Sequence, residues 1–420
     1  MRQLRRPRDL TEDDHLHPRP VYAVWEVTLR CDHACGHCGS RAQTARPSEL
    51  SLEEMCDVAD QLARLGCREV TLIGGEAYLR PDLDQLIAHL TKAGVSVGMQ
   101  TGGLSLTERR LKPLVEAGLG ALGVSVDGPA SAHDILRARP GSWRLAMRAI
   151  RLGASMGLNV NSNTQINQLT LPHLRETADA LEDAGVRAWR VQLTVPMGRA
   201  ADRPEWLLQP WQVVPLMDEL AELKIERLEA AHAAGAHPSS VMDITLANSV
   251  GYYGPHEHLL RSAPGVRARA WQGCQAGRFT IGIESDGKVK ACPSLPTVPY
   301  VGGNIRDLTL SQLWHDRPEL RFARDRTTEE LWGFCKGCYY ADVCRAGCSF
   351  TTHCFLGRRG NNPFCYHRVQ TLAQAGVQEH LVQVEKPAGI PYDYGRFELK
   401  ATTCPAQAAA RRPESLQGAG

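Results

Sequence analysis

The sequence predicts an α/β fold, in which a barrel of alternating strands and helices precedes a small, loop-rich region with many cysteines. Between residue 21 and about residue 200, six short apolar runs alternate with amphipathic stretches, which is typical of βα units around a parallel sheet. The fourteen cysteines are unevenly placed, because five precede residue 68 and eight lie between Cys274 and Cys365. We therefore expect two cysteine-bearing regions separated by a cysteine-free one.

The expected strands are the six apolar runs, and helical periodicity fills several of the intervals between them. The strands span residues 21–29, 69–75, 95–101, 121–126, 158–164 and 188–195, and helices are expected over 50–66, 81–94, 106–118 and 210–234. Ser51 and Glu54 form a capping-box pattern at the first helix. Parallel strands carry catalytic groups at their carboxyl ends, but the period does not distinguish a full barrel from a partial one.

Composition excludes several classes of protein. The net charge is +2, and no run of about 18 apolar residues is present, so we expect neither a nucleic-acid nor a membrane partner. The first twenty residues are charged and lack the apolar segment of a signal peptide, and the basic run at residues 2–8 is expected to be a solvated tail. Fourteen cysteines in a cytoplasmic chain indicate metal or redox chemistry.

Three cysteines lie in one short stretch, CDHACGHC, directly after the first expected strand. Cys31, Cys35 and Cys38 are spaced by four and three residues. Soft thiolates select zinc, copper(I) or iron–sulfur clusters, and zinc favours Cys-x-x-Cys pairs, of which no second one lies nearby. Such a loop can wrap a [4Fe–4S] cluster and leave one iron open. The alternative is three structural thiols in a buried turn.

The loop resembles the cluster motif of radical S-adenosylmethionine (SAM) enzymes. The resemblance implies that the amine and carboxylate of SAM bind the open iron, and that one electron cleaves SAM to methionine and a 5′-deoxyadenosyl radical, which abstracts hydrogen from a substrate. It also implies a partial (β/α)6 barrel, open on one side. His37 stands where the family usually has an aromatic residue near the adenine.

Other strand ends resemble further motifs of this family. Gly74-Gly75-Glu76 resembles the motif that holds the SAM amino group, whereas Gln100-Thr101-Gly102-Gly103 departs from the Thr-Asn-Gly turn of the family and is interpreted as a loop. The resemblance gives roles at SAM to the following residues: ribose or methionine for Ser125 and Asp127, the carboxylate for Arg137, and ribose and adenine for Asn163 and Leu193. A polar turn at 125–127 and a solvated arginine at 137 are the alternatives.

The second cysteine region starts with a predicted β-hairpin, with Cys274 and Cys292 at its two bases. A run with the pattern Cys-x2-Cys-x5-Cys-x3-Cys follows, and then Cys365. The ordered set resembles the SPASM domain of radical SAM enzymes, which holds two auxiliary [4Fe–4S] clusters. The resemblance implies one ligand set of Cys335, Cys338, Cys344 and Cys365, and another of Cys274, Cys292 and Cys348. A zinc-ribbon-like structural site is the alternative.

The remaining cysteines receive different predictions. The second set has only three cysteines, so the fourth ligand position of its cluster is either filled by Cys354 or open for substrate. The alternative for Cys354 is a buried thiol. Cys56 and Cys67 are expected in the core, and Cys404 in a disordered tail. The predicted organisation is an N-terminal tail at 1–20, a radical SAM barrel at 21–200, a helical connector at 201–270, a SPASM domain at 271–366, and a C-terminal helix with a disordered tail at 367–420.

The architecture implies a radical SAM/SPASM enzyme, and we expect its substrate to be a ribosomally made peptide that is crosslinked, oxidised or epimerised. The alternative within the same enzyme family is a small-molecule dehydrogenase, epimerase or decarboxylase. Two alternatives from other classes of protein are an iron–sulfur electron carrier without SAM chemistry and a zinc-stabilised binding module. Pro293 after Cys292 disfavours sulfatase-maturase chemistry. We expect a separate leader-binding protein, since about twenty residues precede the first strand, and a reductant such as flavodoxin or ferredoxin. No general base is assigned.

Overall fold

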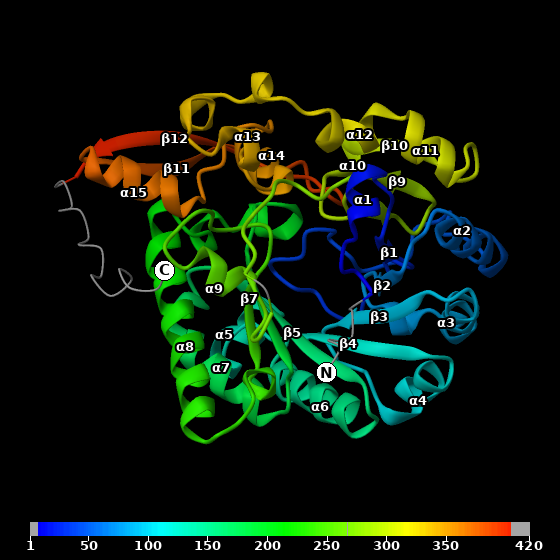
Figure 1. The fold of residues 1–420 in the computed structure, drawn as a ribbon. Helices are drawn as coiled ribbons and strands as arrows, with labels where there is room; N and C mark the ends of the chain where they lie inside the picture. Colours follow the sequence, from blue (N-terminus) through cyan, green and yellow to red (C-terminus); the bar gives the residue numbers. More distant parts are fainter. Residues whose placement is uncertain (1–6, 267, 405–420) are drawn as a thin grey trace.

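The computed structural model describes residues 7–266 and 268–404. Its centre is a ten-stranded sheet in the order β10-β9-β8-β1-β2-β3-β4-β5-β6-β7. Strands β1 to β8 run parallel to their neighbours, and β8, β9 and β10 are antiparallel. Since β10 and β7 are the two ends of the order, the sheet is an open, partial barrel (Figure 1).

All six strands expected from the sequence are present. They are β1 (Tyr22–Glu26), β2 (Glu69–Ile73), β3 (Ser96–Thr101), β4 (Leu119–Ser125), β5 (Asn159–Ile166) and β6 (Ala188–Leu193). The predicted hairpin is also present, as β8 (Thr280–Ile283) and β9 (Lys288–Lys290), and β10 (Val301–Asn304) extends it. Two strands enlarge the barrel sheet beyond the prediction: β7 (Asp243–Leu246) pairs with β6, and β8 pairs with β1. The second cysteine region is thus hydrogen-bonded into the barrel.

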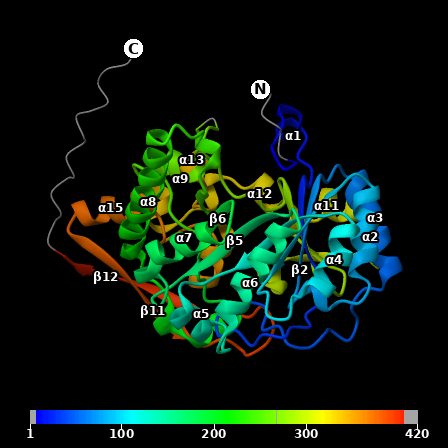
Figure 2. The same ribbon diagram turned by 90° about the horizontal axis from the view of Figure 1, so that it is seen from below.

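Helices cover the outer face of the barrel, as Figures 1 and 2 show. They are α2 (Leu52–Arg64), α3 (Leu83–Lys92), α4 (Glu108–Glu116), α5 (Ala130–Leu136), α6 (Ser142–Ser155), α7 (Leu174–Asp183) and α8 (Val213–Ala233). The capping box of Ser51 and Glu54 is formed at α2. Their apolar faces and the outward faces of the strands make one continuous core. Among residues 7–266 and 268–404, no helix is long and apolar enough to cross a bilayer.

The C-terminal part of the chain lies across one end of the barrel (Figure 1). Its helices are α9 (Glu257–Arg261), α10 (Thr297–Tyr300), α11 (Leu310–Asp316), α12 (Pro318–Asp325), α13 (Ala341–Cys344), α14 (Ser349–Leu356) and α15 (Tyr366–Gln374). The expectation of disorder after the last helix is wrong up to residue 403, because β11 (Val377–Glu385) and β12 (Arg396–Thr403) form a two-stranded sheet. Its residues Leu381 and Phe397 are buried in the core. Residues 405–420 lie outside the described residues.

The N-terminal residues also differ from the prediction of a solvated tail. A short helix, α1 (Glu12–Leu16), carries its own capping box between Thr11 and Asp14. Asp14 is buried and pairs with Arg68, and Arg8 pairs with Glu69 at the start of β2. Most of the basic run lies outside the described residues, but its last arginine is anchored to the barrel.

The inner side of the curved sheet, here called the hollow, carries side chains that are partly accessible to solvent. Along β5, the buried residues Val160, Ser162 and Thr164 alternate with partly exposed residues. In a strand, alternate side chains point to opposite faces, and the buried set lies with the helices. The solvent-accessible inner residues of β3 to β6 are mostly polar, and they include Gln100, Ser125, Asn161, Asn163, Gln165, Arg190 and Gln192.

Candidate functional site

The three-cysteine loop leaves the carboxyl end of β1. Cys35 is buried, and Cys31 and Cys38 are partly exposed. Burial raises the pKa of the Cys35 thiol to about 11, although Arg137, whose Nη1 lies 3.7 Å from its Sγ, opposes the shift. Burial and the nearby Glu76 carboxylate raise the pKa of Cys31 above its ordinary value. Thiols held so close are stable as thiolates only beside a cation, which is the charge that a metal centre provides.

The cysteine sulfurs are not gathered as they would be around a single zinc ion. Four thiolates at Zn–S distances of about 2.3 Å would lie about 3.8 Å apart. Within residues 7–266 and 268–404, no three cysteine sulfurs lie within 4.8 Å of one another. The only such group of possible ligand atoms in that part of the chain comprises Cys31, Asp32 and Glu76. Three soft thiolates on one loop are a ligand set that suits a [4Fe–4S] cluster with one open iron.

Gly74 and Gly75 allow the end of β2 to pack directly against the cysteine loop. A Cβ atom at Gly74 would lie 2.3 Å from the Thr28 carbonyl oxygen, and one at Gly75 would lie 2.3 Å from that of Arg30. Such distances exclude any side chain, so glycine is required at both positions. The close approach places Glu76, the next residue, beside Cys31.

Glu76 is 2% exposed and accepts two hydrogen bonds from the turn after β3. Thr101 Oγ1 donates to Oε2 at 2.6 Å, and the Gly102 N–H donates to Oε1 at 2.6 Å. Burial nevertheless raises the pKa of Glu76 to about 8. The turn interpreted as a mere loop therefore belongs to the site. Its departure from the family pattern has a local reason, because a Cβ at Gly102 would lie 2.6 Å from His33 Nε2.

Asp127 and Arg137 form a buried ion pair behind the cysteine loop. Arg137 donates from Nε and Nη2 to Asp127 Oδ2 at 2.9 and 2.6 Å. His37 Nε2 lies 3.3 Å from the same oxygen, and the Gln165 N–H donates to Oδ1 at 2.8 Å. Although burial opposes it, Arg137 holds the pKa of Asp127 far below its usual range. Both carboxylate oxygens are thus engaged, so Asp127 orients Arg137 instead of facing the hollow.

The two predicted residues on β4 and β5 face the hollow, but the one on β6 does not. Ser125 and Asn163 are partners in register, and Asn163 Nδ2 donates to Gln100 Oε1 at 2.7 Å. Leu193 is 2% exposed and belongs to the core beneath the helices. Its side chain therefore does not reach the position expected for a contact to adenine. Gln192, its neighbour, is the β6 residue on the inner side.

Two further groups of cysteines form in the C-terminal region, in the order that the family resemblance implied. Cys335, Cys338, Cys344 and Cys365 line one hollow together with Tyr252 and Tyr340. Cys274, Cys292 and Cys348 form the second group. Burial first, and then the neighbouring Cys274, raise the pKa of Cys292 to about 11 and that of Cys348 to about 12.

Three cysteines lie apart from these groups. Cys354, on α14, is fully buried in the core, and its burial, followed by the proximity of Cys348, raises the pKa of its thiol well above the ordinary value. Cys67 is buried, as expected. The expectation for Cys56 is wrong, because it is partly exposed beside the buried face of α2 formed by Met55, Val58, Ala59 and Leu62.

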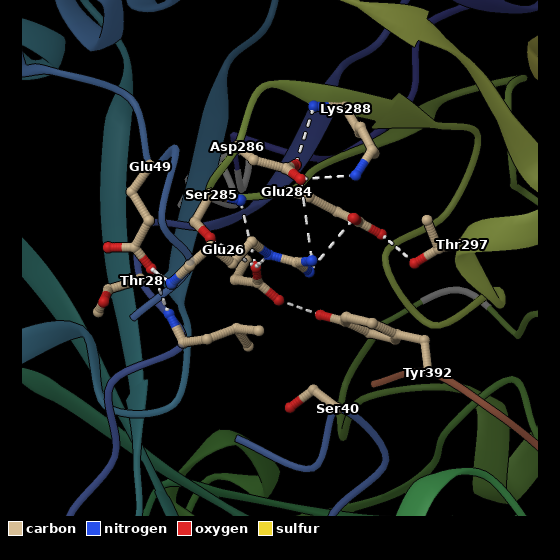
Figure 3. Close-up of polar contacts among 12 residues, drawn as sticks. Glu26, Thr28, Ser40, Glu49, Glu284, Ser285, Asp286, Lys288, Thr297 and Tyr392 are labelled. Carbon is tan, nitrogen blue, oxygen red and sulfur yellow. Dashed lines mark hydrogen bonds and ion pairs between the residues drawn. The ribbon is translucent and has the colours of Figure 1, made fainter. Parts of the chain in front are cut away.

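A cluster of buried charges at the barrel mouth was missed by the sequence analysis (Figure 3). Glu26 ends β1 and Glu284 follows β8, and both are 2% exposed. Arg46 bridges them, with Nε 3.2 Å from Glu26 and Nη2 3.3 Å from Glu284. Tyr392, from the loop between β11 and β12, donates to the other oxygen of Glu26, and its ring lies 4.2 Å from Lys290 Nζ. No spacing motif marks these residues, since they come from four separate segments.

Comparison with known families gives two matches. Residues 25–184 match the radical SAM superfamily, and residues 274–339 match an iron–sulfur cluster-binding domain, SPASM. Together the matches cover more than half of the chain. The first match contains the three-cysteine loop and every residue predicted to contact SAM except Leu193.

Curated relatives and solved structures agree with these families. The chain is 29% identical to an AdoMet-dependent heme synthase of Oleidesulfovibrio alaskensis, over 77% of this chain and 81% of that one. It is 28% identical to mycofactocin maturase MftC of Mycobacterium ulcerans, over 81% and 86%. The structure titled native anSMEcpe with bound AdoMet matches with a TM-score of 0.63 at 18% identity, over 84% and 95%, which supports the fold.

Proposed function

The chain belongs to the radical SAM superfamily and carries a SPASM iron–sulfur domain, and from this premise we propose that it modifies a peptide. Its cofactors are SAM and [4Fe–4S] clusters. When bound, the cluster at the barrel supplies one electron that cleaves SAM to methionine and the 5′-deoxyadenosyl radical. The residues of this chain would bind those cofactors, orient SAM and hold the substrate.

Cys31, Cys35 and Cys38 are the proposed ligands of the SAM-binding cluster. Glu76 would accept a hydrogen bond from the SAM ammonium group, because its buried carboxylate lies beside Cys31 and forms no ion pair within residues 7–266 and 268–404. A cation at this position would favour the ionised carboxylate that burial now disfavours. Thr101 and Gly102 hold the carboxylate in one orientation, so they are proposed as positioning residues.

Arg137 is proposed to face the SAM carboxylate, with Asp127 and His37 as its supports. Two donors of the guanidinium are fixed on Asp127, and Nη1 points to Cys35. A planar fork held in this way loses little entropy when it binds a carboxylate. Ser125 and Asn163, on the inner side of adjacent strands, are proposed to bind the ribose hydroxyls. The side chain of Leu193 lies on the opposite face of β6 and has no proposed contact with adenine.

The two C-terminal cysteine groups are proposed to hold the auxiliary clusters. Cys335, Cys338, Cys344 and Cys365 supply four thiolates, which complete one cluster. Cys274, Cys292 and Cys348 supply three, which leaves one position of the second cluster for another ligand. Cys354 is a poor candidate for that position, because it is packed among apolar side chains in the core.

The observation that carries the choice of a peptide is the lining of the hollow. The inner residues of β3 to β6 include five neutral amides, at positions 100, 161, 163, 165 and 192. An amide side chain both donates and accepts hydrogen bonds, as a peptide backbone does. Arg41 and Arg46, near the cysteine loop, are already paired with carboxylates. The inner face therefore offers amide groups that can pair with a peptide backbone, beside one exposed cation, Arg190, on the same face of β6 as Gln192.

A tetrapyrrole is the second candidate, because relatives at 29% identity include a heme synthase. The test incubates the reconstituted enzyme with SAM and reduced flavodoxin, and with either the peptide encoded by an adjacent short gene or an iron tetrapyrrole that bears carboxylate side chains. Each peptide reaction is run with and without any adjacent recruiter-like protein. A peptide that loses two hydrogens by mass spectrometry supports the proposal. Modification of the tetrapyrrole alone would refute it.

We further propose that a flavodoxin or ferredoxin in the cytoplasm is the electron donor, and that a separate protein binds the leader of the peptide. These two partners follow from the chemistry and from the family resemblance. Replacing flavodoxin by a chemical reductant in the same assay tests the first. Turnover of the peptide that does not change on addition of the recruiter-like protein would contradict the second.

A further inference from the structure

A separate pocket lies beside the second cysteine group, away from the barrel strands. It has a volume of about 280 Å³ and is lined by residues of two segments, 272–278 and 323–345. Cys274 is the one cysteine in its wall. The pocket thus connects the outside of the C-terminal region with one member of the three-cysteine group.

Three arginines dominate the wall of this pocket. Arg278, Arg326 and Arg345 contribute their side chains, and Asp342 is the single carboxylate among the lining residues. Among the described residues, no ion pair joins Arg278 or Arg345 to a carboxylate. Arg345 instead donates to the backbone carbonyls of Arg326 and Asp342. The wall therefore carries an excess of positive charge.

Arg326 is the residue that points most clearly to a ligand. It is 3% exposed, and within the described part of the chain its Nε and Nη2 atoms make no hydrogen bond. Its nearest carboxylate, that of Glu330, lies 3.6 Å from Nε and is itself partly exposed. Burial lowers the pKa of Arg326, which is the cost of a charge taken out of water. Its one hydrogen bond is a long one, from Nη1 to Ser349 Oγ at 3.5 Å. A buried cation normally has its donors paired, so two nitrogens of this guanidinium remain available to a ligand.

We infer that the pocket formed by Arg278, Arg326 and Arg345 is a binding site for an oxyanion, carried by a carboxylate or phosphate group. The planar guanidinium fork matches both groups with two parallel hydrogen bonds. The volume accommodates a small metabolite or one acidic group of a larger molecule. The site is distinct from the SAM site, because none of its lining residues comes from the barrel strands or the cysteine loop.

The position beside Cys274 gives the site its consequence. An anion held by Arg326 would lie next to the cysteine group that has only three thiols, so it would change the electrostatic surroundings of the auxiliary cluster. The alternative role of these guanidiniums is to balance the negative charge of the cluster itself. The two roles can be distinguished, because an anion-binding site still takes up an external anion when the cluster is present, whereas guanidiniums that only balance the cluster charge do not.

The test measures binding of inorganic phosphate and of citrate to the reconstituted holoenzyme by calorimetry, in a chloride buffer and without SAM. Arg326→Gln should weaken binding at least tenfold, because a charge-assisted hydrogen bond of about 1.5–3 kcal/mol is lost. Arg278→Gln, at a less buried position, should weaken it as well and guards against a folding failure of the first variant. The control is Arg321→Gln on α12, which pairs with Asp325 outside the pocket and should leave affinity within twofold.

The second readout is the electron paramagnetic resonance spectrum of the reduced auxiliary clusters. Saturating citrate or phosphate should change it in the wild type and not in Arg326→Gln. Comparing the affinities of the two probes identifies the preferred anion: tighter binding of citrate indicates a carboxylate ligand, and tighter binding of inorganic phosphate indicates a phosphate ligand. Absence of saturable binding, binding by the metal-free protein alone, or equal affinity in Arg326→Gln would each overturn the inference. Because SAM turnover is not measured, these outcomes are independent of the proposed function.

Discussion

Replacing Glu76 by glutamine tests the SAM site most directly. The side chain keeps its size, and the amide oxygen can still accept from Thr101 or Gly102, which lie 2.6 Å from the carboxylate oxygens. What the substitution removes is the negative charge. A hydrogen bond to an ammonium group is worth about 1.5–3 kcal/mol, which corresponds to a ten- to hundredfold change in affinity. We therefore expect the dissociation constant for SAM to rise by that factor.

The assay is anaerobic equilibrium dialysis of radiolabelled SAM against the reconstituted variant, with iron content measured on the same sample. Iron content should stay at the wild-type level, because Glu76 is not a proposed cluster ligand. Glu53→Gln is the matched control, since Glu53 is exposed at the start of α2 and should not affect SAM affinity. An affinity within twofold of the wild type in Glu76→Gln, with full iron content, would refute the role of Glu76.

Three further predictions follow from other contacts. Replacing all three cysteines of the loop at 31–38 by alanine should remove about four irons of twelve and abolish 5′-deoxyadenosine formation, as measured by iron assay and chromatography. Lys224→Met should lower the free energy of unfolding by about 3–5 kcal/mol, because Lys224 is 1% exposed and its ammonium lies 3.2 Å from buried Asp243; denaturant titration measures this. Hydrogen bonding to Arg306 holds the pKa of Glu54 at about 2, below its ordinary 4.5, so its contribution is present above pH 4.5 and is lost as the pH falls toward 2. Glu54→Gln should cost no more than about 1 kcal/mol at pH 7 and flatten that part of the acid-unfolding curve.

The strands could be predicted because their side chains alternate with a period of two, and the same period explains an error. In β6, the apolar residues Trp189, Val191 and Leu193 share the face toward the helices, and Gln192 faces the hollow. Assigning Leu193 to SAM from its region alone ignored this parity. A one-residue difference places a side chain on the opposite face of a sheet, so the polar member of such a pair is the better candidate for a ligand contact.

The cysteine groups could be predicted only from the order of the cysteines in a known family, because members of one group are up to 74 residues apart in the chain. Local spacing cannot state which distant thiols meet. The buried pair of Asp127 and Arg137 has a similar limit. The nine residues between them form a turn and a helix, and only the folded backbone reveals that the arginine turns back onto the aspartate and directs one nitrogen to Cys35.

The C-terminal sheet changes how the chain is divided. If the residues after the last helix were a disordered tail, as predicted, only the first two hundred residues and the hairpin would form the mouth of the barrel. Instead, the loop between β11 and β12 returns to the barrel, where Arg41, three residues after Cys38, binds the Asp393 carboxylate at 2.8 Å. The adjacent Tyr392 covers Glu26 and Arg46. A buried acid and a buried guanidinium need such a cover, because both are costly without partners. The loop between the last described strands is therefore packed against residues at the end of β1 and beside the cysteine loop.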